Sequence, residues 1–138
     1  RPLVLDDLGL VSAVEWLATS FTQRTGVPCK LEVDEDLDLQ EPHATALFRM
    51  VQESLANVAK HAGASEVEIG MARAGDDVLL HVADNGAGFN AAEARKPQSL
   101  GLVGLRERAK LLRGTVEIVS APGQGTRVQA RIPVGDGA

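Results

Sequence analysis

The hydrophobic pattern of this chain switches repeatedly between a helical and a strand period, and the order of the switches limits the folds available to it. Apolar residues recur every three or four positions over three segments, which predicts helices at about 10–21, 42–62 and 101–113. Alternating or short apolar runs predict strands at 29–33, 67–71, 78–83, 115–120 and 127–133.

The last four predicted strands form two pairs, each joined by a short turn, so at least part of the sheet is antiparallel. Helices over one face of such a sheet make a two-layer α/β sandwich of the α+β class, with a mixed sheet. A doubly wound nucleotide fold is disfavoured, because it would need regular β-α-β alternation along the chain.

The composition fits one globular domain and disfavours several classes of protein. With 138 residues, 44% of them hydrophobic, the chain can bury a core. Because only 3% of the residues are aromatic, that core has to consist mainly of Leu, Val, Ile and Ala. The net charge of -5 argues against a nucleic-acid binder, which usually needs a basic surface. No apolar run approaches the roughly 18 to 20 residues of a membrane span.

The start of the chain is expected to belong to a longer protein. The first residue is Arg1 rather than Met, so residues 1–7 are interpreted as a connector and residues 8–138 as the domain. Cys29 is the only cysteine, which excludes an internal disulfide and favours a reducing, cytoplasmic setting.

Three polar residues, Glu53, Asn57 and Lys60, are expected on one face of the second predicted helix, because four and three positions separate them. A solvated helix face is the ordinary interpretation. The alternative is a phosphate and metal site, in which Asn offers a neutral oxygen to Mg²⁺ and Lys pairs with phosphate. Asn has a poor helix propensity, so Asn57 favours the second interpretation.

The motif Asp84-Asn-Gly-Ala-Gly88 follows a predicted strand. Asn-Gly is an ordinary turn sequence. In a binding site, however, its glycines would let the backbone approach a ligand closely. The Asp84 carboxylate would then accept a hydrogen bond from the 6-amino group of adenine, whereas guanine would oppose it with an oxygen.

Two further glycine motifs follow. Gly101-Leu-Val-Gly-Leu105 is expected at the start of the third helix, where free N–H groups can hold phosphate. Gly123-Gln-Gly-Thr126 lies between the last two strands, either as a plain hairpin turn or with the Thr126 hydroxyl bonded to a base or a bridging water. Neither is a P-loop, because G-x-x-x-x-G-K-[ST] does not occur in the chain.

In this order and spacing, the four motifs resemble those of the ATP-binding catalytic domain of two-component sensor histidine kinases, within the superfamily that includes gyrase, Hsp90 and MutL. The resemblance covers nearly the whole chain. It assigns 53–61 to the N box, 84–88 to the G1 box, 101–105 to the G2 region and 123–126 to the last glycine motif. Residues 1–10 and 48–57 resemble the nitrate-sensor-like subfamily, whose kinases usually act on response regulators with a helix-turn-helix.

The resemblance implies a Bergerat-type ATP-binding fold with ATP and Mg²⁺ as cofactors. Asn57 would bind Mg²⁺, Glu53 would support a metal-bound water or catalysis, and Lys60 would meet phosphate. Asp84 would read adenine, and Thr126 would support Asp84 through a water. Residues 89–100 would form a mobile ATP lid. The other residues expected to line or shape the nucleotide site are His61, Gly86, Gly88, Gly101, Leu102, Gly104 and Leu105.

The chain departs from the family pattern in two respects. Phe89 is the only candidate for a Phe-rich F box, which the subfamily often lacks. None of His43, His61 and His81 has the setting of a phosphoacceptor, so the acceptor is expected on dimerisation helices that precede this chain. The fragment would then be a monomer that binds ATP without phosphorylating itself, and the full-length protein a homodimer, often anchored in the inner membrane.

The predicted function is transfer of the γ-phosphoryl group of Mg-ATP to that histidine, for relay to an Asp of a response regulator. Three alternatives stay open: a related ATPase that uses Glu53 to activate water, a serine kinase that acts on a partner protein, and a non-catalytic nucleotide sensor. Adding candidate acceptor proteins distinguishes them, since a sensor would bind ATP without any transfer.

Overall fold

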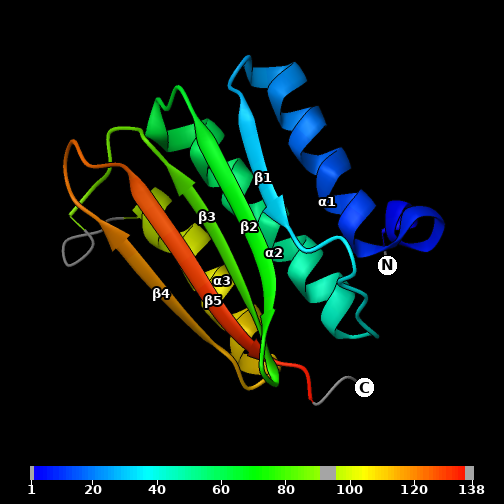
Figure 1. The fold of residues 1–138 in the computed structure, drawn as a ribbon. Coiled ribbons are helices and arrows are strands. Elements are labelled where there is room, and N and C mark those ends of the chain that lie inside the picture. The colour runs from blue at the N-terminus through cyan, green and yellow to red at the C-terminus, as the bar shows by residue number, and fades with distance from the viewer. Residues whose placement is uncertain (1, 91–95, 136–138) are drawn as a thin grey trace.

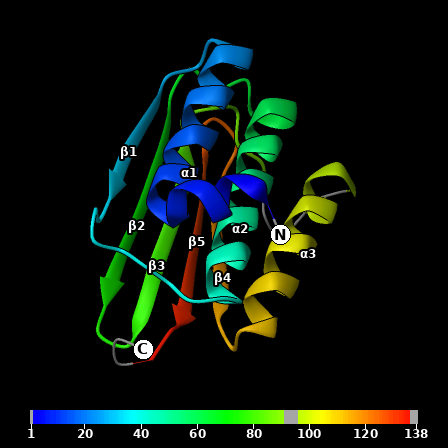
Figure 2. The same cartoon turned by 90° about the vertical axis from the view of Figure 1, so that its right-hand side faces the viewer.

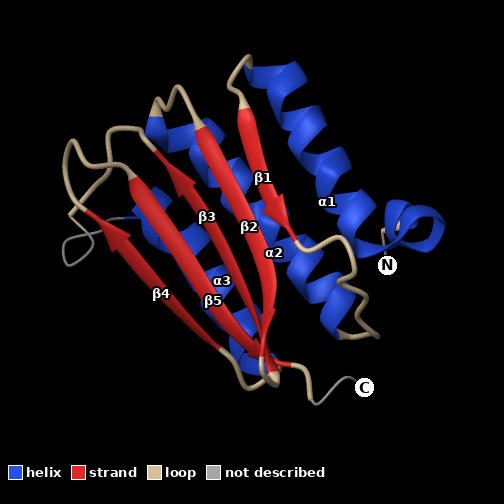
Figure 3. Cartoon of the chain, in the orientation of Figure 1, coloured by secondary structure: helices blue, strands red, loops and turns tan. Residues whose placement is uncertain are grey.

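The structure, a computed structural model, describes residues 2–90 and 96–135. It consists of two layers, a five-stranded sheet and a set of helices packed against one of its faces (Figures 1 and 2). In Figure 3 the helices, drawn in blue, lie on the same side of the red sheet. The predicted two-layer α+β sandwich is therefore confirmed.

The strands follow the order β1-β2-β3-β5-β4 across the sheet. β1 pairs with β2 in parallel, whereas all the other neighbours are antiparallel, so the sheet is mixed as predicted. The last strand in sequence is an interior strand, and its register places Asp84 opposite Thr126. The strands are β1 (Cys29–Val33), β2 (Val67–Ala74), β3 (Asp77–Asp84), β4 (Thr115–Ser120) and β5 (Thr126–Pro133).

The first helix, α1 (Leu3–Thr25), is interrupted at Gly9, where φ is 79°, a value that glycine adopts readily. Residues 3–7, expected to belong to a connector, are helical, and Leu5 among them is buried in the core. The helix ends at Gly26, whose φ of 75° and N–H bond to the Thr22 carbonyl are typical of a C-cap.

The second helix, α2 (His43–Asn57), continues into one π-helical turn, η1 (Val58–Ala62), which ends at Gly63. The predicted end of the helix is confirmed, but the regular α-helical turn expected over 58–62 is not. A π-helix turns each residue by a smaller angle than an α-helix does, because its hydrogen bonds join residues five apart. Lys60 lies in this turn and is exposed, and its place on the face of Glu53 and Asn57 stays a prediction.

The third helix, α3 (Lys96–Leu111), begins five residues before the predicted start at Gly101. Pro97 stands in its first turn, where the missing N–H costs no hydrogen bond. The expected helix start is therefore wrong, because residues 101–105 lie inside the helix. Residues 96–100, the end of the expected lid, are helical, and their role as a lid stays a prediction. Residues 91–95 of that lid lie outside the described part of the structure.

The core fills the space between the sheet and the helices and contains mainly Leu, Val, Ile and Ala, as the composition predicts. The largest fully buried side chains come from α1, α2, α3 and the inner face of the sheet, and include Phe21, Phe48, Leu47, Met50, Ile69, Met71, Leu105 and Ile132. No helix in the described ranges is long and apolar enough to span a bilayer.

Candidate functional site

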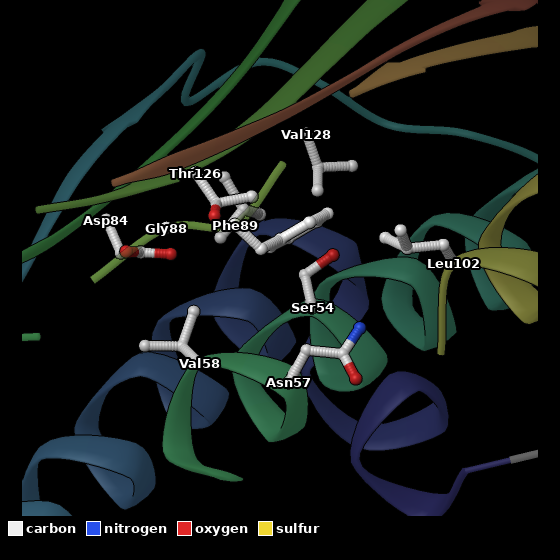
Figure 4. A pocket seen from close by; sticks show the side chains of 10 residues that line it. Ser54, Asn57, Val58, Asp84, Gly88, Phe89, Leu102, Thr126 and Val128 are labelled. Carbon is white, nitrogen blue, oxygen red and sulfur yellow. The ribbon is translucent and has the colours of Figure 1, made fainter. Parts of the chain in front are cut away.

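A cavity of about 50 Å³ lies between the second helix, α3 and the helix-facing side of β3 and β5. Figure 4 shows its lining from close by. Each of the four sequence motifs contributes at least one residue, although they are up to about 70 positions apart. The lining residues are Ser54, Asn57, Val58, Val82, Asp84, Gly88, Phe89, Leu102, Thr126 and Val128.

Asp84 supplies the only carboxylate among these lining residues. The backbone N–H of Gly86 donates to its Oδ1 at 2.8 Å, and the backbone N–H of Thr126 lies near the carboxylate. Burial raises the pKa of Asp84 above the ordinary value for Asp, and the two N–H groups offset part of that rise. The side chain is thereby fixed as a hydrogen-bond acceptor in mainly apolar surroundings.

The second and fourth motifs pack backbone against backbone beneath Asp84. A Cβ atom on Gly88, whose φ is 66°, would lie 2.2 Å from the Ala121 carbonyl oxygen. A Cβ atom on Gly125, whose φ is 73°, would lie 2.1 Å from the Asp84 carbonyl oxygen. Because neither approach leaves room for a side chain, both positions require glycine. A hydrogen bond of 2.6 Å from the Gly123 N–H to the Ala87 carbonyl ties the two loops together.

Ser120, at the end of β4, joins these loops to the segment after Gly88. Its Oγ accepts from the Phe89 N–H at 2.9 Å, donates to the Gly125 carbonyl at 3.0 Å and lies 2.8 Å from the Thr126 Oγ1. Thr126 was expected to support Asp84 through its hydroxyl and a water. In the structure that hydroxyl pairs with Ser120, and its link to Asp84 through a water stays a prediction.

Asn85 holds the other side of the Asp84 loop. Its Oδ1 accepts from the backbone N–H groups of Ser65 and Glu66 at 2.9 and 3.0 Å, and its Nδ2 donates to the Ser65 Oγ at 2.9 Å. These bonds attach the loop to the segment just after η1. The Asn85-Gly86 pair therefore forms a turn, which was the ordinary interpretation of this sequence. The same turn also positions the Asp84 carboxylate.

Glu53 and Asn57, one helical turn apart, have different surroundings. Asn57 lines the cavity. The Glu53 Oε1 forms an ion pair with the Arg108 Nε of α3 at 2.6 Å, and the two side chains are 29% and 39% exposed. Gly104 allows this contact, because a Cβ atom there would lie 3.0 Å from the Glu53 Oε2. Glu53 is thus held against α3 at the edge of the site.

The remaining predicted residues are spread more widely. Leu102 lines the cavity, whereas Leu105 is 0% exposed and belongs to the core. Lys60 is exposed and is not part of the lining. Gly101 lies within α3, and the side chain of His61 is outside the described part of the structure.

Sequence reasoning missed two kinds of site residue. Val58, Val82 and Val128 line the cavity, but their periodicity also fits the core, so no signal distinguished the two roles. The polar residue Ser54 carried a signal that was overlooked, because it stands within the apolar stripe of α2 between Val51 and Leu55.

Comparison with known proteins agrees with this geometry. Residues 43–136 match the model of the histidine kinase-, DNA gyrase B- and HSP90-like ATPase family. The chain belongs to this family. The match confirms the family resemblance that the four motifs indicated, and ATP is the ligand of an ATPase domain of this family.

Relatives of this ATPase domain are sensor kinases. The histidine-protein kinase/phosphatase DegS of Bacillus subtilis is 36% identical over 97% of this chain, and the sensor histidine kinase MctS of Rhizobium johnstonii is 37% identical over 96%. The chain spans about a third of each relative, 36% of DegS and 29% of MctS.

Solved structures show the same fold at lower identity. The blue-light activated histidine kinase of Erythrobacter litoralis superimposes with a TM-score of 0.76 at 21% identity, over 91% of this chain and 42% of that one. Histidine kinase AdeS of Acinetobacter baumannii gives 0.72 at 14% identity, over 95% of this chain and 72% of that one.

Proposed function

We propose that this chain is the catalytic domain of a sensor histidine kinase, which binds Mg-ATP and donates its γ-phosphoryl group to a histidine on helices outside the chain. The observation that carries the proposal is the Asp84 carboxylate, held by the Gly86 N–H in a mainly apolar cavity. The names of the relatives, all of them histidine kinases, support the choice of reaction.

Asp84 and its surroundings suit adenine in particular. The ionised carboxylate accepts from the 6-amino group, while Val58, Val82, Val128 and the Phe89 ring offer apolar contact to a flat base. Guanine would place an oxygen opposite the carboxylate, and both groups would then be acceptors. A buried polar group left without a partner costs about 1–3 kcal/mol, so the site should prefer ATP to GTP.

Asn57 fits Mg²⁺ as one of its few protein ligands. Its amide lines the cavity (Figure 4), and no hydrogen bond to it is found among the described residues. Mg²⁺ keeps several waters and takes one or two protein oxygens beside phosphate, so a single amide oxygen meets its needs. When bound, Mg²⁺ offsets the charge that builds up on the phosphate oxygens.

Glu53 would act from one helical turn before Asn57. In the described structure its carboxylate is fixed by Arg108, so Arg108 sets its direction relative to the phosphates. Lys60 and His61, just beyond Asn57 in the chain, would meet the phosphates at the outer end of the site. Catalysis by such a set of residues is mainly positioning and electrostatics.

The transfer itself breaks the bond between the γ-phosphorus and the bridging oxygen and forms a bond from that phosphorus to an acceptor histidine nitrogen, while ADP leaves with the electron pair. His43 and His81 are poor acceptors, because their Nε2 atoms lie 2.9 Å from the Pro133 carbonyl and the Glu68 carboxylate, away from the cavity. We expect the acceptor on dimerisation helices, followed by relay to a response regulator in the cytoplasm.

Titration calorimetry of the chain with Mg-ATP and Mg-GTP tests the nucleotide site. Wild type should bind ATP much more tightly than GTP, and Asp84→Ala should weaken ATP binding by about tenfold or more, because it removes a hydrogen bond to a charged group. Asp77→Ala is the matched control, since Asp77 lies at the other end of β3, paired with Arg131. Absence of ATP binding to folded wild type would refute the proposal.

The kinase step needs a second assay, in which a dimerisation hairpin bearing the acceptor histidine is added. Phosphate that is stable to base and labile to acid should appear on the hairpin, and Asn57→Ala should abolish it. Steady ATP hydrolysis without an acceptor would favour the ATPase alternative. Binding without transfer or hydrolysis would favour a nucleotide sensor.

A further inference from the structure

One hydroxyl group in the cavity has no partner. Ser54 is 3% exposed, and its Oγ forms no hydrogen bond with any described residue. Two neighbouring side chains of the cavity do have partners, since the Asp84 Oδ1 accepts from the Gly86 N–H and the Thr126 hydroxyl pairs with Ser120. Figure 4 shows Ser54 on α2 with its oxygen turned into the cavity, toward Phe89.

An unpaired hydroxyl is costly in such a place, because burial removes its hydrogen bonds with water. A helical serine often avoids this cost by bonding the carbonyl four residues earlier, but Ser54 does not do so. Asn57 and the apolar Val58, each about one turn away, are the other residues of this helix that line the cavity. An alanine would therefore pack as well without the cost, which indicates that the hydroxyl serves something absent from the free chain.

We propose that Ser54 is a base-specificity residue: its hydroxyl donates a hydrogen bond to a ring nitrogen of the adenine whose 6-amino group meets Asp84. This inference rests on the proposed function and adds a second polar contact to it. Ser54 and Asp84 line the same small cavity and share its apolar walls, so a base that reaches the carboxylate also passes the hydroxyl. Adenine ring nitrogens are acceptors, and the serine O–H is the donor that matches them.

If Ser54 is kept for this contact, its unpaired hydroxyl should lower the stability of the free protein. Removing an unsatisfied buried hydroxyl is neutral or stabilising, because no bond is lost in the folded state. Ser54→Ala should therefore leave the melting temperature of the free chain unchanged or higher, while it weakens ATP binding. A residue that only packs would not separate stability from affinity in this direction.

Calorimetry with Mg-ATP and its 1-deaza, 3-deaza and 7-deaza analogues tests the proposal on wild type, Ser54→Ala and the control Ser12→Ala, a helical serine on α1. Ser54→Ala should bind ATP about three- to tenfold more weakly than wild type, the net effect of one neutral hydrogen bond. For one of the three analogues, the one without the bonded nitrogen, wild type and Ser54→Ala should bind equally. Ser12→Ala should match wild type throughout.

The outcomes separate this inference from the proposed function. If wild type binds Mg-ATP and Ser54→Ala binds it equally well, Ser54 does not contact the base and only the inference fails. If Ser54→Ala weakens ATP and all three analogues by the same factor, the hydroxyl does not bond a ring nitrogen, and the inference fails as well. If folded wild type does not bind Mg-ATP, the proposed function fails and takes the inference with it.

Discussion

Replacing Gly125 with Ala tests whether the two glycine loops fix the backbone of Asp84. The added methyl would sit 2.1 Å from the Asp84 carbonyl oxygen and 3.1 Å from the Cα of Asn85. An ordinary contact begins at about 3.4 Å, so the carbonyl would have to retreat by roughly 1 Å. Both groups are backbone, so no side-chain rotation relieves the overlap.

Gly123→Ala provides a matched control in the same loop. Gly123 has a φ of 78°, close to the 73° of Gly125, but a Cβ atom there would have no neighbour within 4 Å. Both substitutions carry the cost of placing Ala in a left-handed conformation, about 1–2 kcal/mol. Only Gly125→Ala adds the overlap with Asp84, and forced overpacking costs about 1–3 kcal/mol more.

Urea unfolding followed by circular dichroism measures the difference in unfolding free energy between the two variants. We expect Gly125→Ala to be less stable than Gly123→Ala by about 1–3 kcal/mol. Calorimetry under folding conditions should also show at least about tenfold weaker ATP binding for Gly125→Ala alone, because the acceptor proposed to recognise adenine would have moved. Equal destabilisation of the two variants, with equal ATP affinity, would refute the close approach as the reason for glycine at position 125.

Three further outcomes are expected. Burial raises the pKa of Asp84, so the folded chain holds the proton of the Asp84 carboxyl group more tightly than the unfolded chain does. Near neutral pH, where this carboxyl group is ionised, its burial therefore lowers the free energy of unfolding. Asp84→Asn should therefore unfold at a higher urea concentration than wild type at about pH 7, and this gain in stability should fade as the pH falls to about 4. A difference between the two urea midpoints that does not change with pH would contradict a raised pKa of Asp84. Arg108→Ala should lower the free energy of unfolding by less than about 1 kcal/mol, as expected of a partly exposed ion pair. A double-mutant cycle with Glu53→Gln that shows no coupling would mean that the pair does not form in solution. Gly104→Ala should raise the melting temperature by about 2–4 °C, since Ala is favoured in a helix interior by about 1 kcal/mol, and a fall would show that crowding of Glu53 outweighs helix propensity.

Much of the fold was predictable, because the hydrophobic period changes at the boundaries of the elements. The strands end within a few residues of their predicted limits, and Gly26 and Gly63 end their helices with positive φ. The start of α3 was not predicted, because the glycine motif at 101–105 suggested a helix start there, whereas the start signal is Pro97. The π-helical turn after Asn57 has no local sequence signal comparable to a cap.

The candidate site was predictable in its motifs but not in its contacts. Asp84, Asn57 and Thr126 do come together, because the register of β3 with β5 and the packing of α2 on the sheet bring them to one place. The pairing of Glu53 with Arg108 depends on the crossing of α2 and α3, which no local pattern encodes. The roles of Ser120 and Ser54 likewise depend on neighbours far along the chain.

The position of β5 has a consequence for the order in which the protein folds. Among the described residues, β5 is the last strand in sequence, yet it lies between β3 and β4 and is the only strand that pairs with β4. Until it inserts, β3 has an open edge that can pair with another chain, and β4 has no hydrogen-bonded neighbour. Insertion is a contact between distant segments and should therefore be slow. In the proposed site ATP would bind only after this step, because Thr126 and Val128 belong to β5. Nucleotide would then protect the finished sheet against reopening, but it would not help a chain in which β5 has not yet inserted.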